Sequence, residues 1–328
     1  MKSDPTTIAR ARLALRKATR DFMFDPNVNL IGIGYPEHNG QIAENEIAIR
    51  VHVNQKLSGV ALEAATAAGY TRPIPSEING FPTDVLQGTY HLHQWQAWRG
   101  WWRPTTSGNE RAMSADPMRG GISISDEFHM AYGTLGGKVY DRATGEEMIL
   151  SNWHVLAGDW RARRGQLIYQ PGRLDGGTFS NASAHLTRHA MEVNLDAAVA
   201  TLTGRRRLIN EQLGLGPVLG ASNAQLGDEV VKSGRSSYIT YGRIVEINSV
   251  ARIHYGYLER LVRDVMIIDP WNGGEVSRPG DSGSWWLNRA TRQAVGLHFA
   301  GSDMPERALA LNMQSVLDAL GVEIRGLG

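Results

Sequence analysis

The amino-acid sequence predicts a mainly β protein, in which a small unit of helices and strands precedes two β-barrels. From about Met118 onward, short apolar segments alternate with glycine-rich turns over roughly 200 residues, which is typical of an all-β barrel architecture. The preceding residues instead mix two helix-like segments with alternating apolar and polar stretches. A chain of 328 residues is long enough for two domains, each with its own core.

The first hundred residues begin with a helix. Ser3 or Asp4 can cap it, Pro5 suits its first turn, and it continues to about residue 21. Strands are expected at residues 27–35, 47–53 and 83–90, and an alanine-rich helix at 57–69. We therefore predict an α+β domain over residues 1–105 that supplies no catalytic group and acts in regulation or assembly.

A cluster of tryptophans follows this domain. Trp95, Trp98, Trp101 and Trp102 are four of the nine tryptophans, and the spacing of three of them matches one helical face. We expect the Trp95–Trp102 cluster to pack between domains or subunits, and homo-oligomerisation through it is the preferred reading; a ligand-stacking surface is the alternative. Residues 106–117 are polar and predict a linker.

Residues 118–328 predict the second, β-rich domain. Its strands are expected at 130–140, 147–151, 195–202, 229–233, 241–248, 264–268, 283–287 and 293–299. A helix is expected at 312–320 near the end of the chain. Strands this short and numerous favour closed barrels over one open sheet.

Composition excludes several classes of partner. The net charge of +1 gives no electrostatic case for nucleic acid or a membrane surface, and no run of 18 apolar residues is present. The chain has no cysteine and no apolar leader segment, so a cytoplasmic location is expected. His91 and His93 could bind a metal, but no carboxylate cluster lies near them, so we expect neither metal nor cofactor.

Three segments carry the chemistry. Gly280–Ser284 reads Gly-Asp-Ser-Gly-Ser, His154 follows an apolar strand, and Asp196 precedes another. The order along the chain is histidine, aspartate, serine, with spacings of 42 and 86 positions. Taken singly, each residue has an ordinary reading, as a core histidine, a capping acid or a turn serine. Together, in this order, they indicate a catalytic triad.

Each member has a definite task. Ser282 would be the nucleophile, and it needs a base because a serine hydroxyl is unreactive near neutral pH. His154 would take and return the proton, while Asp196 would fix its tautomer. The backbone N–H groups of Gly280 and Ser282 would form the oxyanion hole, because glycine allows a tight turn there.

These motifs resemble those of the trypsin-like (chymotrypsin-fold) serine peptidases. The chain is most similar to an intracellular bacterial branch related to the plant leaf-shape protease Narrow Leaf 1. The matching segments are 27–34, 74–85, 133–136, 150–157, 170–172, 232–235, 280–284 and 295–301. The resemblance implies a chymotrypsin-like double β-barrel and a serine endopeptidase that acts on protein or peptide substrates. The alternatives are a non-catalytic scaffold on this fold and a processing protease active only within an assembly.

The sequence departs from the pattern of these peptidases in two places. Ser236-Ser237-Tyr238 stands where Thr-Thr-Gly is expected, in a loop near the substrate pocket. In zymogen-activated relatives the acid at the position of Asp281 pairs with a newly cut N-terminus. Over a hundred residues precede the protease part here, so Asp281 needs another partner, and Arg278 is one candidate.

The resemblance also indicates the substrate-binding residues. Val276 stands where trypsin-type enzymes carry an acid, so a preference for Lys or Arg is not expected. Ser277 and His298 could donate hydrogen bonds to a Glu or Gln side chain. A pocket for a medium apolar side chain is the alternative. In either case Phe299 and Gly301 should bind the backbone of an extended substrate.

Overall fold

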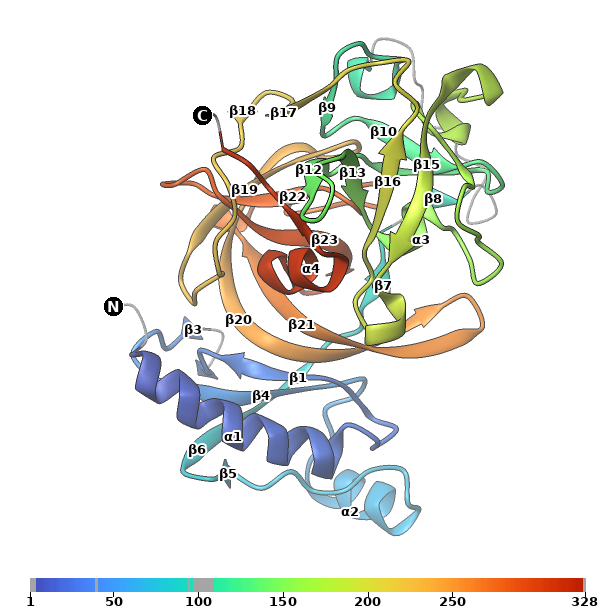
Figure 1. Cartoon of the computed structure of the whole chain (residues 1–328). Helices are drawn as coiled ribbons and strands as arrows, with labels where there is room; N and C mark the ends of the chain where they lie inside the picture. Colours follow the sequence, from blue (N-terminus) through green and yellow to red (C-terminus); the bar gives the residue numbers. More distant parts are fainter. Residues whose placement is uncertain (1–3, 39–40, 94, 97–108, 327–328) are drawn as a thin grey trace.

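The computed structural model describes residues 4–38, 41–93, 95–96 and 109–326, and it confirms a mainly β fold. Figure 1 shows an N-terminal layer of helices and strands beneath two β-rich bodies. The N-terminal elements are α1 (Pro5–Phe22), β1 (Val28–Gly34), β2 (Glu37–His38), β3 (Gln41–Ile42), β4 (Ala48–Val53), α2 (Gly59–Ala67), β5 (Glu77–Ile78), β6 (Phe81–Gln87), β7 (His91–Leu92) and β8 (Trp95–Gln96). The predicted helices and strands of this region are therefore present within a few residues of their expected limits.

The first barrel follows. Its strands are β10 (Ser123–Asp126), β11 (Ala131–Thr134), β12 (Gly137–Asp141), β13 (Glu147–Ser151), β14 (Leu167–Tyr169), β15 (Ala182–His189) and β16 (Ala198–Leu202), with the short helix α3 (Trp153–Leu156) after β13. The strand before them, β9 (Met118–Gly120), belongs to a separate small sheet. Pairing runs β12-β13-β16-β15-β14-β10-β11. Only Leu135 and Gly136 separate β11 from β12, so the chain itself closes the ring.

The second barrel closes entirely through strand pairing. Its strands are β19 (Glu229–Gly234), β20 (Tyr238–Tyr255), β21 (Leu258–Pro270), β22 (Trp285–Asn288), β23 (Ala294–Asp303) and β24 (Glu306–Asn312), followed by α4 (Met313–Leu320). Between the barrels in sequence, β17 (Leu208–Gln212) and β18 (Gly216–Pro217) form a small sheet with β9, and the last strand, β25 (Val322–Glu323), pairs with β12 of the first barrel. The order β19-β22-β23-β24-β21-β20 returns to β19, which also pairs with β20. This confirms the double β-barrel preceded by an α+β unit.

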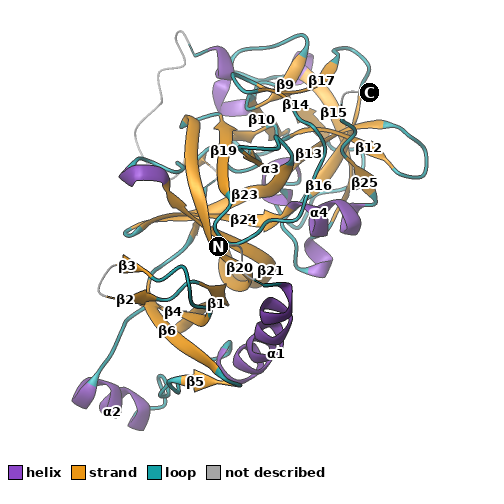
Figure 2. Cartoon of the chain, turned by 90° about the vertical axis from the view of Figure 1, so that its left-hand side faces the viewer, coloured by secondary structure: helices purple, strands orange, loops and turns teal. Residues whose placement is uncertain are grey.

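The N-terminal unit shares a sheet with the second barrel. β1 pairs antiparallel with β20 on one side and with β4 on the other. Helix α1, which Asp4 caps through the Thr7 amide, contacts β1 and β4 and buries its alanine-rich face. Figure 2 shows α1 beside these strands. The unit is therefore joined to the barrel by backbone hydrogen bonds as well as by the chain connection.

The connecting segment only partly behaves as a linker. Within the predicted linker at 106–117, the described part packs against the barrels, and Arg111 is buried. Its guanidinium donates to Ser233 Oγ at 2.6 Å and to the carbonyl of Gly121. Trp95 lies in strand β8 rather than on a helix, while Trp98, Trp101 and Trp102 lie outside the described residues. The role of the tryptophans in assembly stays a prediction.

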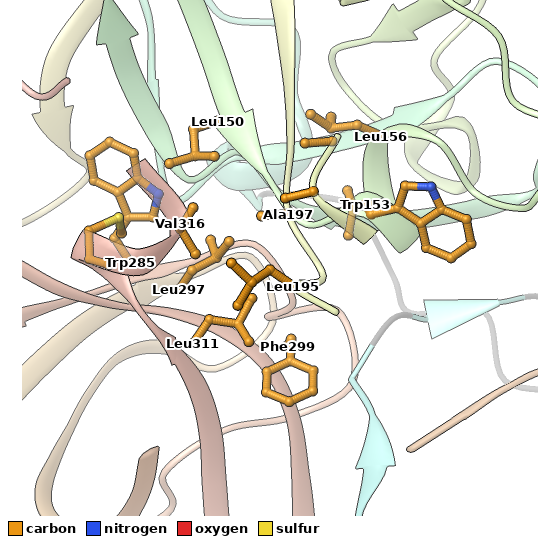
Figure 3. Close-up of a cluster of buried hydrophobic side chains, with 14 of the residues drawn as sticks. Leu150, Trp153, Leu156, Leu195, Ala197, Trp285, Leu297, Phe299, Leu311 and Val316 are labelled. Atoms are coloured by element: carbon orange, nitrogen blue, oxygen red, sulfur yellow. The ribbon is translucent and has the colours of Figure 1, made fainter. Parts of the chain in front are cut away.

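The main core lies where the two barrels and α4 meet. Leu150 and Ala197 of the first barrel face Trp285, Leu297 and Leu311 of the second (Figure 3). All five side chains are buried. This shared apolar layer fixes the two barrels against each other, which matters because His154 and Ser282 come from different barrels. No helix in the described parts of the chain is long and apolar enough to cross a membrane.

Candidate functional site

His154 and Asp196 form a buried hydrogen-bonded pair. His154 lies on α3, directly after β13, and Asp196 directly precedes β16, which pairs with β13. The His154 Nδ1 lies 2.5 Å from Asp196 Oδ2, and the His154 amide donates to Oδ1 at 3.1 Å. Asn152 Nδ2 also donates to the Asp196 carbonyl. Two contacts thus fix the histidine relative to the acid, and the pairing leaves Nε2 without a hydrogen-bond partner among the described residues.

Tyr255 is a member of this site that sequence reasoning missed. Its hydroxyl donates to Asp196 Oδ2 at 2.9 Å from the end of β20. Burial, together with the neighbouring Asp196 carboxylate, raises the pKa of Tyr255 well above its usual value, so it remains a donor. No local motif marks this residue, because 59 positions separate it from Asp196 and only barrel packing brings the two together.

Ser282 lies in a tight turn that only glycine permits at two positions. Gly280 and Gly283 have φ values of 102° and 98°, in the left-handed region. A Cβ on Gly283 would meet the Thr134 carbonyl and the Ser151 hydroxyl at 2.1 Å. The glycines are thus required both for the backbone conformation and for the close approach of the two barrels.

Strand β11 brings Ser282 beside the His154 helix. The Thr134 amide donates to the Ser282 carbonyl at 2.7 Å, and a Cβ on Gly133 would meet both that carbonyl and Val155. The Ser282 hydroxyl, however, donates to the carbonyl of Phe299 at 3.0 Å. His154 Nε2 has no hydrogen-bond partner among the described residues. The three predicted triad residues therefore converge, but the hydroxyl points toward β23 rather than toward the imidazole.

Asp281 pairs with Lys232, and not with the Arg278 side chain. Lys232 Nζ lies 2.9 Å from Asp281 Oδ2, and both side chains are fully buried. The Arg278 guanidinium pairs with Glu275, and only its backbone amide reaches Asp281. Burial alone would raise the pKa of Asp281, but the Lys232 ammonium and the hydrogen bonds from Ser237 and Lys232 together hold the pKa far below its usual range. An internal lysine thus provides the cation that the sequence comparison assigned to an N-terminus.

The loop with the unexpected Ser236-Ser237-Tyr238 sequence also serves Asp281. The amides of Ser236 and Ser237 donate to Asp281 Oδ1 at 2.9 and 3.0 Å, and the Ser237 hydroxyl donates to Oδ2. Tyr238 adopts a φ of 60°, the conformation that a glycine would adopt without strain. Tyr238 therefore adopts the left-handed conformation that the expected glycine would favour.

The predicted pocket residues separate into two groups. His298, Phe299 and Gly301 lie along β23 beside the turn, and Ser277 is buried with no hydrogen-bond partner for its hydroxyl among the described residues. Val276 instead belongs to a cluster under the N-terminal helix that includes Ile244 and Trp286. Burial lowers the pKa of His298 well below its usual value, so its ring is neutral at pH 7.

His91 and His93 also lie at this site. β7 pairs antiparallel with β23, with Leu92 opposite Ala300 and His91 opposite Gly301. The His93 ring lies against His298, with 3.3 Å between its Nδ1 and His298 Nε2. Burial lowers the pKa of His93 to about 4. Among the described residues, no group of three or more metal-ligating side chains is present.

A cavity of about 520 Å³ opens next to His154. Its walls come from the segment around Tyr90, from the Trp153–Trp160 region and from the β20–β21 hairpin. The residues that line it are Tyr90, His91, Leu92, His129, Trp153, His154, Gly158, Asp159, Trp160, His254, Tyr255, Gly256 and Tyr257. The imidazole of the His154–Asp196 pair therefore has access to open space on one side.

Comparison with known proteins gives structural likenesses only. No protein-family model matches the chain, and no curated protein matches it. The structure is similar to Thermobifida fusca Protease A (18% identity, 64% of this chain and 100% of that chain, TM-score 0.47). It is also similar to Nocardiopsis Protease (18%, 64% and 99%, TM-score 0.48). A third likeness is to a glutamic acid specific serine protease that uses a histidine triad in substrate binding (17%, 63% and 100%, TM-score 0.47).

Proposed function

We propose that this protein is a serine endopeptidase that hydrolyses protein or peptide substrates through an acyl-enzyme. The observation that carries the proposal is the buried His154–Asp196 pair, whose helix α3 contacts the same strand, β11, that hydrogen-bonds to Ser282. Two further donors on Asp196, the His154 amide and Tyr255, hold the carboxylate in place. A histidine oriented in this way can activate a serine hydroxyl that rotates toward it, which is how such sites generate a nucleophile.

The reaction begins with rotation of the Ser282 side chain. Its hydroxyl leaves the Phe299 carbonyl and turns toward His154 Nε2, a change between staggered rotamers that is fast and low in cost. His154 then removes the hydroxyl proton as the oxygen attacks the substrate carbonyl carbon, and later delivers the proton to the leaving amine. Asp196 stabilises the imidazolium that forms between these steps.

The negative charge that develops on the substrate oxygen needs donors fixed in advance. The Gly280 and Ser282 amides belong to a turn that the buried Lys232–Asp281 pair and the Thr134 hydroxyl hold in place, the latter by donating to the Gly280 carbonyl at 2.9 Å. Donors of this kind are worth on the order of 100- to 1,000-fold in rate. No cofactor is required for any step of this scheme.

The substrate would pair with β23 as an antiparallel strand. The side chain of the substrate residue directly before the cleaved bond would then lie beside His298 and Ser277. These two buried polar groups favour a side chain that forms hydrogen bonds, such as Glu or Gln, over an apolar one. Lys and Arg are disfavoured because the Asp281 carboxylate near His298 is already paired with Lys232 and is not available to a cationic side chain. A cytoplasmic location and membership of the intracellular branch similar to Narrow Leaf 1 are proposed on the absence of cysteine and on the sequence motifs.

Labelling with a fluorophosphonate probe tests the catalytic assignment. We expect wild-type protein to form a covalent adduct on Ser282, located by peptide mass spectrometry, because only an activated serine reacts with this probe. Ser58→Ala is the control and should label at Ser282 like wild type, since Ser58 is exposed and its side chain makes no capping hydrogen bond. An adduct on a different serine, or none under any condition, would contradict the assignment.

Cleavage-site profiling of a peptide library tests the pocket. We expect the preference for Glu or Gln before the cleaved bond to fall about tenfold or more in His298→Ala, because one hydrogen bond of about 1.5 kcal/mol is lost. The unfolding midpoint should be measured alongside, since His298 is fully buried. A dominant preference for Lys or Arg, or a profile that His298→Ala leaves unchanged, would refute this reading of the pocket.

A further inference from the structure

The positions expected to bind substrate are already contacted by the protein's own chain. Phe299 and Gly301 were expected to bind a substrate backbone, Gly280 to bind the carbonyl oxygen, and His298 to contact the side chain. Residues 91–93 make all four kinds of contact, although they lie about 190 positions before Gly280 in the sequence. A single three-residue segment thus contacts four of the predicted substrate-binding positions, and these contacts define its register relative to β23.

In this register, His93 takes the place of the substrate residue directly before the cleaved bond. The His93 amide donates to the carbonyl of Phe299 at 3.1 Å, and the His93 carbonyl accepts from the Gly280 amide. The imidazole of His93 is 95% buried by area and lies against His298. His93 therefore has its amide, carbonyl and side chain at the positions that a substrate residue would use, and His91 lies opposite Gly301 two positions earlier.

The same segment continues into the first barrel. Beyond His93, β8 pairs antiparallel with β11, with Trp95 opposite Tyr132 and Gln96 opposite Ala131. β7 thus adds a strand to the second barrel and β8 adds one to the first. Because Ser282 lies where the barrels meet, a chain that pairs with both on either side of His93 crosses the active site as an extended substrate would.

The N-terminal unit anchors this segment from its other end. The hydroxyl of Tyr90 lies 2.6 Å from His52 Nδ1 on β4, and His52 Nε2 lies 2.9 Å from Glu246 Oε2 on β20. Tyr90, His52 and Glu246 are all buried. The residue directly before the segment is therefore fixed by a polar network that connects the N-terminal sheet with the second barrel.

We infer that residues 91–93 are a built-in occupant of the substrate cleft, so the enzyme is autoinhibited until this segment leaves. The inference rests on the proposed protease function. An occupant on the same chain competes at a high effective concentration, so each tenfold excess of the occupied form lowers the apparent affinity for substrate tenfold. Because Tyr90 attaches this segment to the N-terminal unit, the unit would regulate access to the cleft, in line with the role predicted from sequence.

A reversible disulfide tests the inference in the full-length protein. Leu92 and Ala300 are directly opposed, and they form a non-hydrogen-bonded pair because the neighbouring pair, His93 and Phe299, is hydrogen-bonded. Such pairs bring the Cβ atoms close enough for a disulfide, and the chain has no other cysteine. We expect oxidised Leu92→Cys/Ala300→Cys protein to react with fluorophosphonate at least about tenfold more slowly than wild type, and dithiothreitol to restore the rate. Leu92→Cys alone, treated with the same oxidant, is the control.

The opposite change should activate the enzyme. His93→Pro removes the amide that donates to Phe299, and proline within a strand disrupts pairing. We expect this variant to label at least about tenfold faster than wild type, with circular dichroism showing that the two barrels remain folded. Measurable labelling at equal rates in wild-type, oxidised and His93→Pro protein would overturn the inference and leave the protease assignment intact. An absence of labelling in every form, His93→Pro included, would instead overturn the proposed function and the inference with it.

Discussion

Replacing Ser282 with alanine should abolish peptide hydrolysis while leaving the protein folded. The loss should be on the order of 1,000-fold or more in kcat, because nucleophile, base and acid act as one unit. For the same reason the double variant Ser282→Ala/His154→Ala should lose little more than either single variant. Turnover of a peptide substrate, followed by mass spectrometry, measures the effect, preferably on the His93→Pro background, where we expect the cleft to be open.

The fold of the variant must be checked separately. Ser282 makes one side-chain hydrogen bond, to the Phe299 carbonyl, so its loss should cost only about 0.5–1.5 kcal/mol of unfolding free energy. Equal near-ultraviolet circular dichroism of wild type and Ser282→Ala would show that activity is lost through chemistry. Appreciable turnover by a folded Ser282→Ala protein would mean that Ser282 is not the nucleophile.

Replacing Lys232 with methionine should destabilise the protein strongly. The substitution keeps the length of the side chain but leaves Asp281 as a buried carboxylate without its cation. Removing one member of a buried ion pair typically costs about 3–5 kcal/mol. Because Asp281 also holds the Ser236–Ser237 loop and adjoins the nucleophile, activity should fall together with stability. Denaturant unfolding measures the first effect and fluorophosphonate labelling the second.

Arg278→Ala is the matched control for Lys232→Met. Arg278 was the partner suggested by sequence, but its guanidinium is largely exposed and pairs with Glu275. Exposed ion pairs contribute about 0–1 kcal/mol, so this variant should unfold close to wild type. If Arg278→Ala were as destabilising as Lys232→Met, the assignment of Lys232 as the counter-charge would be wrong.

Several helices, strands and one turn of this protein can be predicted from local sequence. The helix that Asp4 caps, the strands around Ile31 and Val51, and the C-terminal helix are placed by capping residues and apolar periodicity, which act over a few neighbours. The Gly280–Ser284 turn also follows from sequence, because only glycine tolerates the φ values found at Gly280 and Gly283. The order of histidine, aspartate and serine then suffices to nominate the site, since each residue has one of the few side chains suited to its task.

Tertiary structure decided what depends on residues far apart in the chain. Lys232 pairs with Asp281 across 49 positions, and Tyr255 reaches Asp196 across 59, because barrel closure brings β19 to the turn and the end of β20 to the acid. His91 and His93 form a weak metal motif in the sequence, yet in the fold β7 pairs with β23 and places both histidines beside the Ser282 turn. Such contacts cannot be predicted from the residues that neighbour them in sequence. They arise only when packing of the apolar core sets which strands become neighbours, and that packing is a property of the whole chain.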